Sequence, residues 1–343
     1  MEILTDYSLE EVKAKFSADG LPAFRGKQVY EWALKGANYD EITNLPKELI
    51  ANIRDKYAIT ALKIGECLVA KDGTKKFLYE LRDGNIIEGV LMSYSYGKTL
   101  CVSTQVGCRM GCAFCASGIG GLVRNLSAGE ILGQLIAVNR LEGGGRAITN
   151  VVLMGSGEPL DNFDNVMKFL ELATAEFGIS QRNISLSTSG IVPKIEELGK
   201  RFAVTLTISL HATTDEIREG IMPVNKKYKI GELISAAREY FELTGRRVIF
   251  EYAMIDGVND SDEDAVRLAT LLRGFPTHIN LIRLNYVKEK NLKPSSNERI
   301  KSFVAVLEKH KASVTIRRSM GSDIAGACGQ LRRKKLSGTE GDN

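Results

Sequence analysis

The chain has few histidines, one tryptophan and no long apolar run. Of its 343 residues only His211, His278 and His310 are histidine. No apolar stretch approaches the roughly 20 residues that a membrane-spanning helix needs, and the acidic start Met1-Glu2-Ile3 does not have the pattern of a secretory signal peptide. We therefore expect a cytoplasmic protein without membrane contact, whose six cysteines are reduced or bound to metal. A net charge of +4 does not by itself indicate nucleic-acid binding.

Three of the cysteines lie within eight residues. Cys108, Cys112 and Cys115 have the spacing C-x3-C-x2-C, and a glycine-rich segment follows them directly. Thiolates are ligands that suit zinc or an iron-sulfur cluster, and glycines let the backbone approach a bulky inorganic group. The spacing predicts that the three thiols bind one metal centre.

Three interpretations of this cysteine loop differ in what they require. Buried structural cysteines seldom gather so closely in the sequence. A structural zinc site needs a fourth ligand, and the chain has neither a second C-x2-C nor a histidine near the loop. A 4Fe-4S cluster held by three thiolates leaves one iron open, and this spacing resembles that of the radical S-adenosylmethionine (SAM) superfamily, in which the open iron binds SAM.

The pattern of apolar, polar and turn-forming residues changes three times along the chain, which predicts four regions. Residues 1–60 indicate a small helical module that begins with the capping box Ser8-Leu9-Glu10-Glu11. Residues 61–96 indicate a short antiparallel β extension, because strand-like runs alternate with Asp-Gly turns. Residues 97–318 repeat strand, loop and helix, and residues 319–343 form a C-terminal segment rich in small residues and ending in a basic, polar tail.

The repeating region predicts an α/β fold with parallel strands and crossover helices. The expected strands span residues 100–103, 150–154, 183–187, 204–209, 248–254 and 279–284, and a last strand spans 313–318. The expected helices span residues 127–141, 163–177, 193–200, 229–244, 261–273 and 297–310. In such folds the loops at the carboxyl ends of the strands carry the chemistry. The cysteine loop follows the first strand, so we expect the site at this edge.

Three further cysteines and one carboxylate have two interpretations each. Cys67 lies in an expected strand and is most simply a core residue. Cys101 could be a buried apolar residue and Cys328 an incidental turn residue, or both could be functional thiols. Glu88 stands in an apolar strand, where most carboxylates face water on the outer side of the sheet.

Motifs over nearly the whole chain resemble those of one family, the dual-specificity ribosomal RNA and transfer RNA adenine C2-methyltransferases, which are radical SAM enzymes. They are Phe24-Arg25-Gly26-Lys27-Gln28, the segment from Cys101 to Cys108, the cysteine loop, Gly157-Glu158-Pro159-Leu160, Leu186-Ser187-Thr188-Ser189-Gly190, Ser209-Leu210-His211-Ala212, Gly257-Val258-Asn259-Asp260, Ile279-Asn280-Leu281-Ile282 and Ala327-Cys328-Gly329-Gln330-Leu331. The resemblance implies a radical SAM partial (β/α)6 barrel and makes residues 1–60 a candidate RNA-binding module.

The resemblance also implies a role for particular residues. The ligands of the 4Fe-4S cluster would be Cys108, Cys112 and Cys115. The SAM-binding residues would be Gly157, Glu158, Ser187, Ser209, Leu210, His211 and Asn285. Cys328 would carry the methyl group, Cys101 would close a disulfide bond with it, and Glu88 would accept the proton.

The implied reaction uses two SAM molecules per turnover. The first methylates the Cys328 thiolate, and the second is cleaved to a 5′-deoxyadenosyl radical that activates the S-methyl group for addition to C2 of adenine. The implied substrates are 23S rRNA, at the peptidyl transferase centre, and tRNA, at the adenosine 3′ of the anticodon. The family also implies flavodoxin or ferredoxin as electron donor, and we expect a monomer.

Two other functions compete with this one. Arg283 stands where the C2 enzymes often have proline, and the similar C8-adenosine methyltransferases associated with antibiotic resistance can have arginine there. The N-terminal motif and Lys71-Asp72-Gly73-Thr74 favour the C2 enzymes. The other alternative is a non-catalytic, zinc-stabilised RNA-binding protein.

Overall fold

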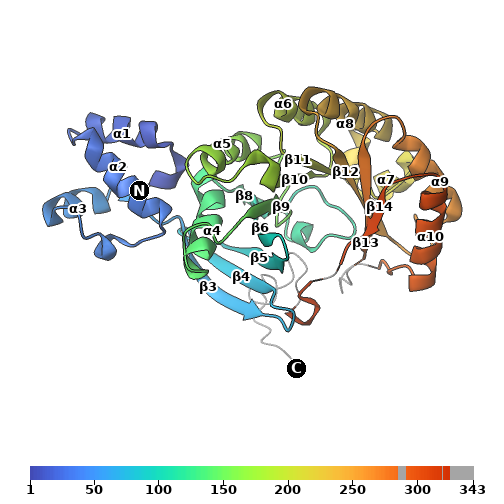
Figure 1. Cartoon of the computed structure of the whole chain (residues 1–343), viewed down its shortest axis with the longest axis horizontal. Helices are drawn as coiled ribbons and strands as arrows, with labels where there is room; N and C mark the ends of the chain where they lie inside the picture. The colour runs from blue at the N-terminus through green and yellow to red at the C-terminus, as the bar shows by residue number, and fades with distance from the viewer. Residues whose placement is uncertain (285–290, 319, 325–343) are drawn as a thin grey trace.

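One large twisted sheet organises the molecule. The computed structural model describes residues 1–284, 291–318 and 320–324. Ten strands follow one another in the order β14-β13-β12-β11-β10-β9-β6-β5-β4-β3. The predicted residues Asn285 and Cys328 and the basic tail lie outside the described residues. Figure 1 shows that the sheet is curved and that helices cover its outer side.

The parallel half of the sheet confirms the predicted alternation of strands and helices. Its strands are β6 (Gly97–Cys101), β9 (Asn150–Leu153), β10 (Ile184–Thr188), β11 (Thr205–Ser209), β12 (Val248–Met254), β13 (Thr277–Arg283) and β14 (Val314–Ile316). The crossover helices are α4 (Ala128–Leu141), α5 (Phe163–Ala175), α6 (Val192–Arg201), α8 (Ile230–Thr244), α9 (Asp262–Leu271) and α10 (Asn297–Lys309). A short helix, α7 (Asp215–Ile221), was not predicted. The predicted capping box of α4 is present, because the Ser127 and Glu130 side chains each accept a hydrogen bond from the other residue's backbone N–H.

The predicted antiparallel strands extend the same sheet. They are β3 (Leu62–Val69), β4 (Lys75–Leu81) and β5 (Ile86–Tyr94), and β5 pairs antiparallel with β6. The expectation that Cys67 is a core cysteine is wrong: it is exposed on β3, the edge strand of the sheet. The cysteine loop lies between the short strands β7 (Gln105–Gly107) and β8 (Leu122–Asn125), which pair with each other.

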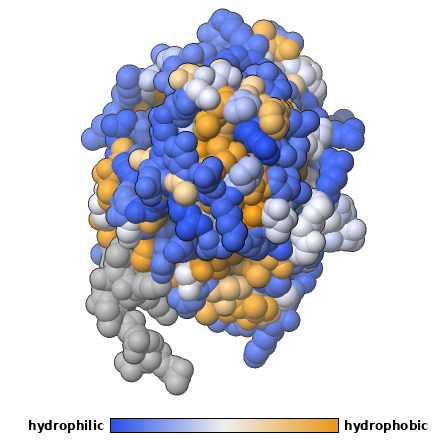
Figure 2. All heavy atoms as spheres, turned by 90° about the vertical axis from the view of Figure 1, so that its left-hand side faces the viewer, coloured by the Kyte–Doolittle hydropathy of each residue, from blue (hydrophilic) through white to orange (hydrophobic). Residues whose placement is uncertain are grey.

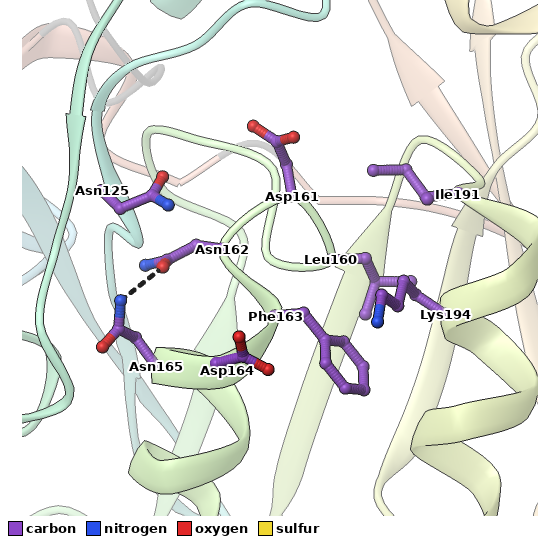
Figure 3. Close-up of a pocket in the computed structure, with 9 residues that line it drawn as sticks. All are labelled: Asn125, Leu160, Asp161, Asn162, Phe163, Asp164, Asn165, Ile191 and Lys194. Carbon is purple, nitrogen blue, oxygen red and sulfur yellow. Dashed lines mark hydrogen bonds between the residues drawn. The ribbon is translucent and has the colours of Figure 1, made fainter.

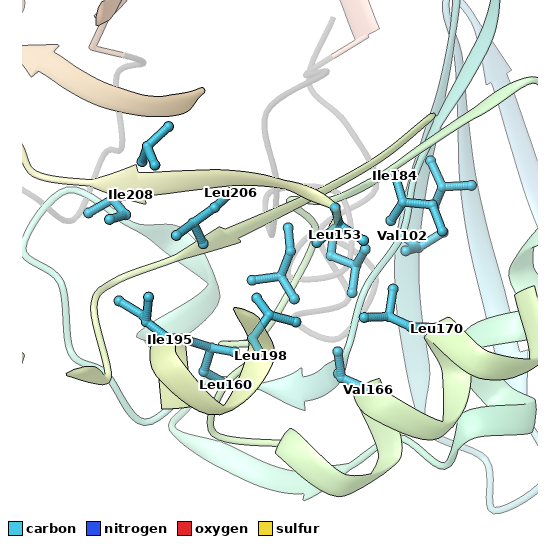
Figure 4. Close-up of a cluster of buried hydrophobic side chains, with 14 of the residues drawn as sticks. Val102, Leu153, Leu160, Val166, Leu170, Ile184, Ile195, Leu198, Leu206 and Ile208 are labelled. Atoms are coloured by element: carbon cyan, nitrogen blue, oxygen red, sulfur yellow. The ribbon is translucent and has the colours of Figure 1, made fainter. Parts of the chain in front are cut away.

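The main core fills the space between the sheet and the helices. Side chains alternate along each strand, so residues such as Leu206 and Ile208 of β11 face α6 while their neighbours face the interior of the barrel. Figure 4 shows this packing, with Ile195 and Leu198 of α6 among the strand residues. Truncating one such fully buried leucine to alanine typically costs about 2–5 kcal/mol.

The N-terminal module has its own apolar core. It comprises β1 (Glu2–Ile3), α1 (Leu9–Ala18), α2 (Ala23–Leu34), α3 (Lys47–Arg54) and β2 (Tyr57–Ala58). The predicted capping box at Ser8 and Glu11 is present. Asp6 joins the module to the barrel, because its carboxylate accepts a hydrogen bond of 2.6 Å from the backbone N–H of Gly129 at the start of α4. Figure 2 shows this side of the molecule, where polar side chains surround a central apolar patch.

The described helices were also compared with the requirements of a lipid bilayer. Among them, none has both the length and the apolar character that crossing a membrane requires.

Candidate active site

Two predicted catalytic residues lie on the concave face of the sheet. On β5, Ile87 and Leu91 belong to the core under the helices, so Glu88 points to the opposite, interior side. Cys101 ends β6, pairs in register with Val90 of β5, and packs there in a small apolar cluster of its own. The strand alternation therefore places Glu88 and Cys101 on one face.

Glu88 faces a buried cation. Its carboxylate lies 3.1 Å from the Lys76 ammonium group, and the two residues are 4% and 0% exposed. The expectation that a carboxylate here faces water is therefore wrong. An apolar strand can bury a carboxylate when an opposite charge accompanies it. Nothing in the sequence pattern marks Lys76, on the neighbouring strand β4, for this role.

The cysteine loop brings its three thiols near one another. Cys108 is buried, and Cys112 and Cys115 are half-buried. Burial raises the pKa of Cys108 to about 11, and burial followed by the charges of Cys115 and Cys108 raises the pKa of Cys112. Within the described part of the chain, no three histidine, cysteine or carboxylate side chains already stand at metal-binding positions. The donors are nevertheless three mutually interacting thiols on one loop, which suits an iron-sulfur cluster better than a hard cation.

The loop after β9 is built tightly against the strand that precedes the cysteines. Gly157 has φ +109°, and a Cβ atom there would stand 2.6 Å from Cβ of Gln105. The buried Glu158 carboxylate accepts hydrogen bonds from the Thr188 hydroxyl and the Ser189 backbone N–H, both at 2.7 Å. Burial raises the pKa of Glu158 in spite of these bonds. Glu158 thus joins the loops that follow β9 and β10.

Arg218 of α7 joins the next two loops and was missed by sequence reasoning. The side chain is fully buried, and its guanidinium donates to the backbone oxygens of Leu210, Ser209 and Ser189 and to Oδ1 of Asn225. Burial lowers its pKa to about 10. Ser189 is therefore held on both sides, its N–H by the Glu158 carboxylate and its oxygen by Arg218.

His211 adopts a backbone conformation that is unusual for this residue type. Its φ is +56°, and its buried ring accepts a hydrogen bond of 3.0 Å at Nδ1 from the Ala253 backbone N–H. Burial, and then the charge of Arg218, lowers its pKa to about 3, so the imidazole is neutral. The ring meets Phe114 of the cysteine loop edge-on, with centroids 4.7 Å apart. Asn259, from the predicted motif after β12, donates to the His211 backbone oxygen at 2.8 Å.

Ser187 and Ser209 are half-buried on the interior side of β10 and β11. Ser209 pairs in register with Glu251 of β12, a buried carboxylate that accepts a hydrogen bond of 2.7 Å from Arg317. Burial raises the pKa of Glu251. The interior face thus has polar groups on several adjacent strands, as expected for a site that binds a polar ligand.

A polar pocket of about 360 Å³ lies beside the N-terminal ends of α5 and α6 (Figure 3). Its lining comprises Asn125, Leu160, Asp161, Asn162, Phe163, Asp164, Asn165, Ile191 and Lys194. None of the predicted site residues lines it. Its Asp161 nevertheless reaches the cysteine loop, because the carboxylate binds the Arg109 guanidinium at 2.5 and 2.9 Å.

Two predicted site residues, Asn285 and Cys328, lie outside the described residues, so their placement stays a prediction. The described residues give no support for a disulfide bond. The remaining predicted residues lie on strands β5, β6, β10 and β11 or in the loops that follow β6, β9 and β11. Loops after parallel strands meet at one edge of a sheet, as expected for a site.

Comparison with known proteins gives four consistent matches. The family model of the radical SAM superfamily matches residues 102–269. The "Probable dual-specificity RNA methyltransferase RlmN" of Clostridium perfringens (strain 13 / Type A) is 50% identical over 342 residues, 98% of each chain. That of Alkaliphilus oremlandii is 50% identical over 338 residues, 97% of this chain and 98% of the relative. The crystal structure of a radical SAM methyltransferase from Sphaerobacter thermophilus superposes with a TM-score of 0.92 at 44% identity, over 96% of this chain and 99% of that one.

Proposed function

The chain belongs to the radical SAM superfamily and, within it, to the RlmN family of dual-specificity RNA methyltransferases, and on this premise we propose that it methylates C2 of adenosine. The substrates are 23S rRNA, at the peptidyl transferase centre, and tRNA, at the adenosine 3′ of the anticodon. The observation that carries the proposal is the likeness to RlmN proteins, which extends over 98% of the chain and includes every region that holds a predicted site residue.

The family implies a 4Fe-4S cluster and SAM. Cys108, Cys112 and Cys115 hold the cluster, and their mutual proximity on one loop supports this assignment. When bound, the cluster supplies the electron that cleaves SAM, which gives the radical chemistry that an electron-poor aromatic C–H requires. Gly157, Glu158, Ser187, Ser209, Leu210, His211 and Asn285 surround SAM. Of the described members, Glu158 shapes the site by positioning the loop after β10, because its carboxylate is occupied by that loop.

Cys328, Cys101 and Glu88 handle the methyl group and the proton. The Cys328 thiolate would take a methyl group from one SAM by displacement, and the radical formed from a second SAM would remove one hydrogen from this S-methyl group, so two SAM molecules would be used per turnover. After the methylene carbon has joined C2, the C2 hydrogen would leave as a proton to Glu88. Attack of the Cys101 thiolate on the Cys328 sulfur would break the sulfur–carbon bond and form a disulfide bond, and methylated RNA would be released once the methylene carbon has taken up a proton and the adduct has given up its unpaired electron.

The pairing with Lys76 supports the role of Glu88. A buried carboxylate needs a charged or hydrogen-bonding partner. The Lys76 ammonium group, 3.1 Å from the Glu88 carboxylate, is such a partner. The target adenosine must be unstacked to enter this concave face, because C2 is hidden within a duplex. We further infer a cytoplasmic monomer that receives electrons from flavodoxin or ferredoxin.

The test is methylation in vitro without oxygen. Reconstituted protein is incubated with SAM, a reductant and protein-free rRNA or tRNA, and the nucleosides are compared by mass spectrometry with 2-methyl- and 8-methyladenosine. We expect 2-methyladenosine. The Cys328→Ala variant should transfer no methyl group to RNA, whereas Cys67→Ala, which changes an exposed cysteine of the edge strand, should keep wild-type activity.

Other outcomes would overturn parts of the proposal. If 8-methyladenosine forms instead, the carbon is assigned wrongly, and Arg283 becomes the first residue to examine. If the purified protein is colourless and contains zinc, the protein is not a radical SAM enzyme. If Cys328→Ala still methylates RNA, the role of Cys328 is refuted.

A further inference from the structure

The turn between β3 and β4 contacts the first residues of the C-terminal segment. Asp72 at this turn accepts a hydrogen bond of 3.0 Å at Oδ2 from the Gly321 backbone N–H. In return, the Asp323 carboxylate accepts one of 3.1 Å from the backbone N–H of Lys71. About 250 residues separate the partners along the chain. Figure 1 shows the hairpin beside the red segment that follows β14.

The turn is shaped for this contact. Oδ1 of Asp72 accepts a hydrogen bond of 2.9 Å from the Thr74 backbone N–H, which fixes the carboxylate so that Oδ2 points toward Gly321. The bond from Gly321 is the largest cause that lowers the pKa of Asp72, so the carboxylate is charged at neutral pH. Gly321 has φ +62°, and a Cβ atom there would stand 3.1 Å from Cγ2 of Thr74.

A neighbouring contact directs the same segment toward the concave face. Met320 packs against the apolar cluster formed by Val90, Met92 and Cys101. The residues that follow β14 are therefore held at two points, one at the hairpin and one beside Cys101. Cys328 lies only five residues beyond Asp323.

We propose that Asp72 is a positioning residue, which anchors residues 320–324 to the β3–β4 hairpin and thereby sets the point from which the segment carrying Cys328 reaches the active site. The inference rests on the proposed function of Cys328. A chain of five residues spans at most about 18 Å when fully extended. The anchor thus limits how far Cys328 can lie from Asp323.

The length of the tether gives the size of the expected effect. Without the hairpin contact, the last residue that still contacts the sheet is Met320, which packs beside Cys101 and lies eight residues before Cys328. The local concentration of a tethered group falls about as the −3/2 power of tether length, so lengthening from five to eight residues lowers it roughly twofold.

The experiment compares two aspartates in similar Asp-Gly turns. Asp72→Ala removes the bond from Gly321 and leaves the bond between the Lys71 N–H and Asp323 in place. Asp83→Ala changes the β4–β5 turn, where the carboxylate likewise accepts a local bond, from Asn85 N–H at 3.0 Å, and also binds Arg124 of β8 at 2.6 Å. Anaerobic assays of both holoenzymes measure methyl transfer to Cys328, by peptide mass spectrometry, and methyl transfer to RNA. For Asp72→Ala we expect kcat to fall roughly twofold, with KM for SAM unchanged. Asp83→Ala should match the wild type, and Asp72→Asn, which keeps an acceptor oxygen, should retain most of the activity.

Two further measurements separate positioning from general destabilisation. Hydrogen exchange of residues 318–324 should become faster in Asp72→Ala while the strands β3 and β4 stay protected. Gly321→Ala, which changes the other partner, should lower kcat in the same way.

The outcomes distinguish this inference from the proposed function. If the wild type methylates neither Cys328 nor RNA, the proposed function fails. If the wild type is active and Asp72→Ala has the same kcat as Asp83→Ala, only the anchor is refuted. A parallel rise in KM for SAM would also refute it, because the damage would then include the SAM site.

Discussion

Replacing Arg218 with methionine tests whether one buried cation holds together the chain segments at the carboxyl ends of β10 and β11. The side chain donates four hydrogen bonds at 2.7–3.1 Å, three of them to backbone oxygens that follow β10 and β11. Methionine has nearly the same length and fills the space without donating. Arg218→Met therefore removes the bonds while creating little cavity.

The expected loss follows from two opposing effects. Hydrogen bonds to a charged group contribute about 1.5–3 kcal/mol each, so four give a gross loss of about 6–12 kcal/mol. The variant no longer buries a charge, which returns several kcal/mol. Desolvation opposes this charge, and burial accordingly lowers the pKa of Arg218 to about 10. We expect a net loss of about 3–5 kcal/mol in the free energy of unfolding.

The assay is urea denaturation of the wild type and of two variants, followed by far-UV circular dichroism. The matched control is Arg267→Met. Arg267 likewise donates side-chain hydrogen bonds, to a threonine and a carboxylate, but it is half-exposed at the surface of α9. It should lose less than about 1 kcal/mol. In calorimetric titration, SAM should bind more weakly to Arg218→Met than to the wild type, whereas Arg267→Met should bind SAM as the wild type does. A loss below about 1 kcal/mol in Arg218→Met would refute the reasoning, since the orphaned carbonyls would then find water at no cost.

Three further predictions address single contacts. Lys76→Met should cost about 3 kcal/mol and Lys76→Met combined with Glu88→Gln clearly less; a double-mutant cycle in urea that shows no coupling would contradict this. Gly157→Ala should lower stability by about 2 kcal/mol and weaken SAM binding, because its Cβ would overlap Gln105; an unchanged melting temperature would exclude the clash. His211 has a native pKa of about 3 against an ordinary 6.5, so only the unfolded chain gains its proton between these values, and the free energy of unfolding should fall by about 2 kcal/mol from pH 7 to pH 5. His211→Asn, which tolerates positive φ, should lose this dependence in urea titrations at the two pH values.

The fold was predictable where the local pattern and the tertiary environment agree. The runs around Leu206 and Phe250 alternate in a sheet covered by helices, so each expected strand lies within a few residues of an observed one. Cys67 shows the limit of this reasoning. Its strand is at the edge of the sheet, and strand order cannot be read from apolar content, so a cysteine expected in the core is exposed.

The site was predictable where chemistry requires particular residue types close together in the sequence, as at Cys108, Cys112 and Cys115. Lys76 and Arg218 could not be found in this way. Each is an ordinary cation in a polar stretch, and its role depends on a partner from another strand or loop. A single sequence contains no signal for such a pairing, because the contact exists only after the strands have assembled.

Ser189 shows what these unpredicted groups add to the motifs. The glycine-rich loop after β9 provides Glu158, and the helix α7 provides Arg218, and the two bind the N–H and the oxygen of this one residue. Both side chains are buried, so burying either one without a partner would cost free energy. The backbone N–H and oxygen of Ser189 give each of them a hydrogen-bond partner. Arg218 also holds Ser209 and Leu210, which lead into His211, whose ring touches the cysteine loop at Phe114. The loops of four strands are thus fixed to one another before any ligand binds, which is what a site that must hold a reactive radical away from water requires.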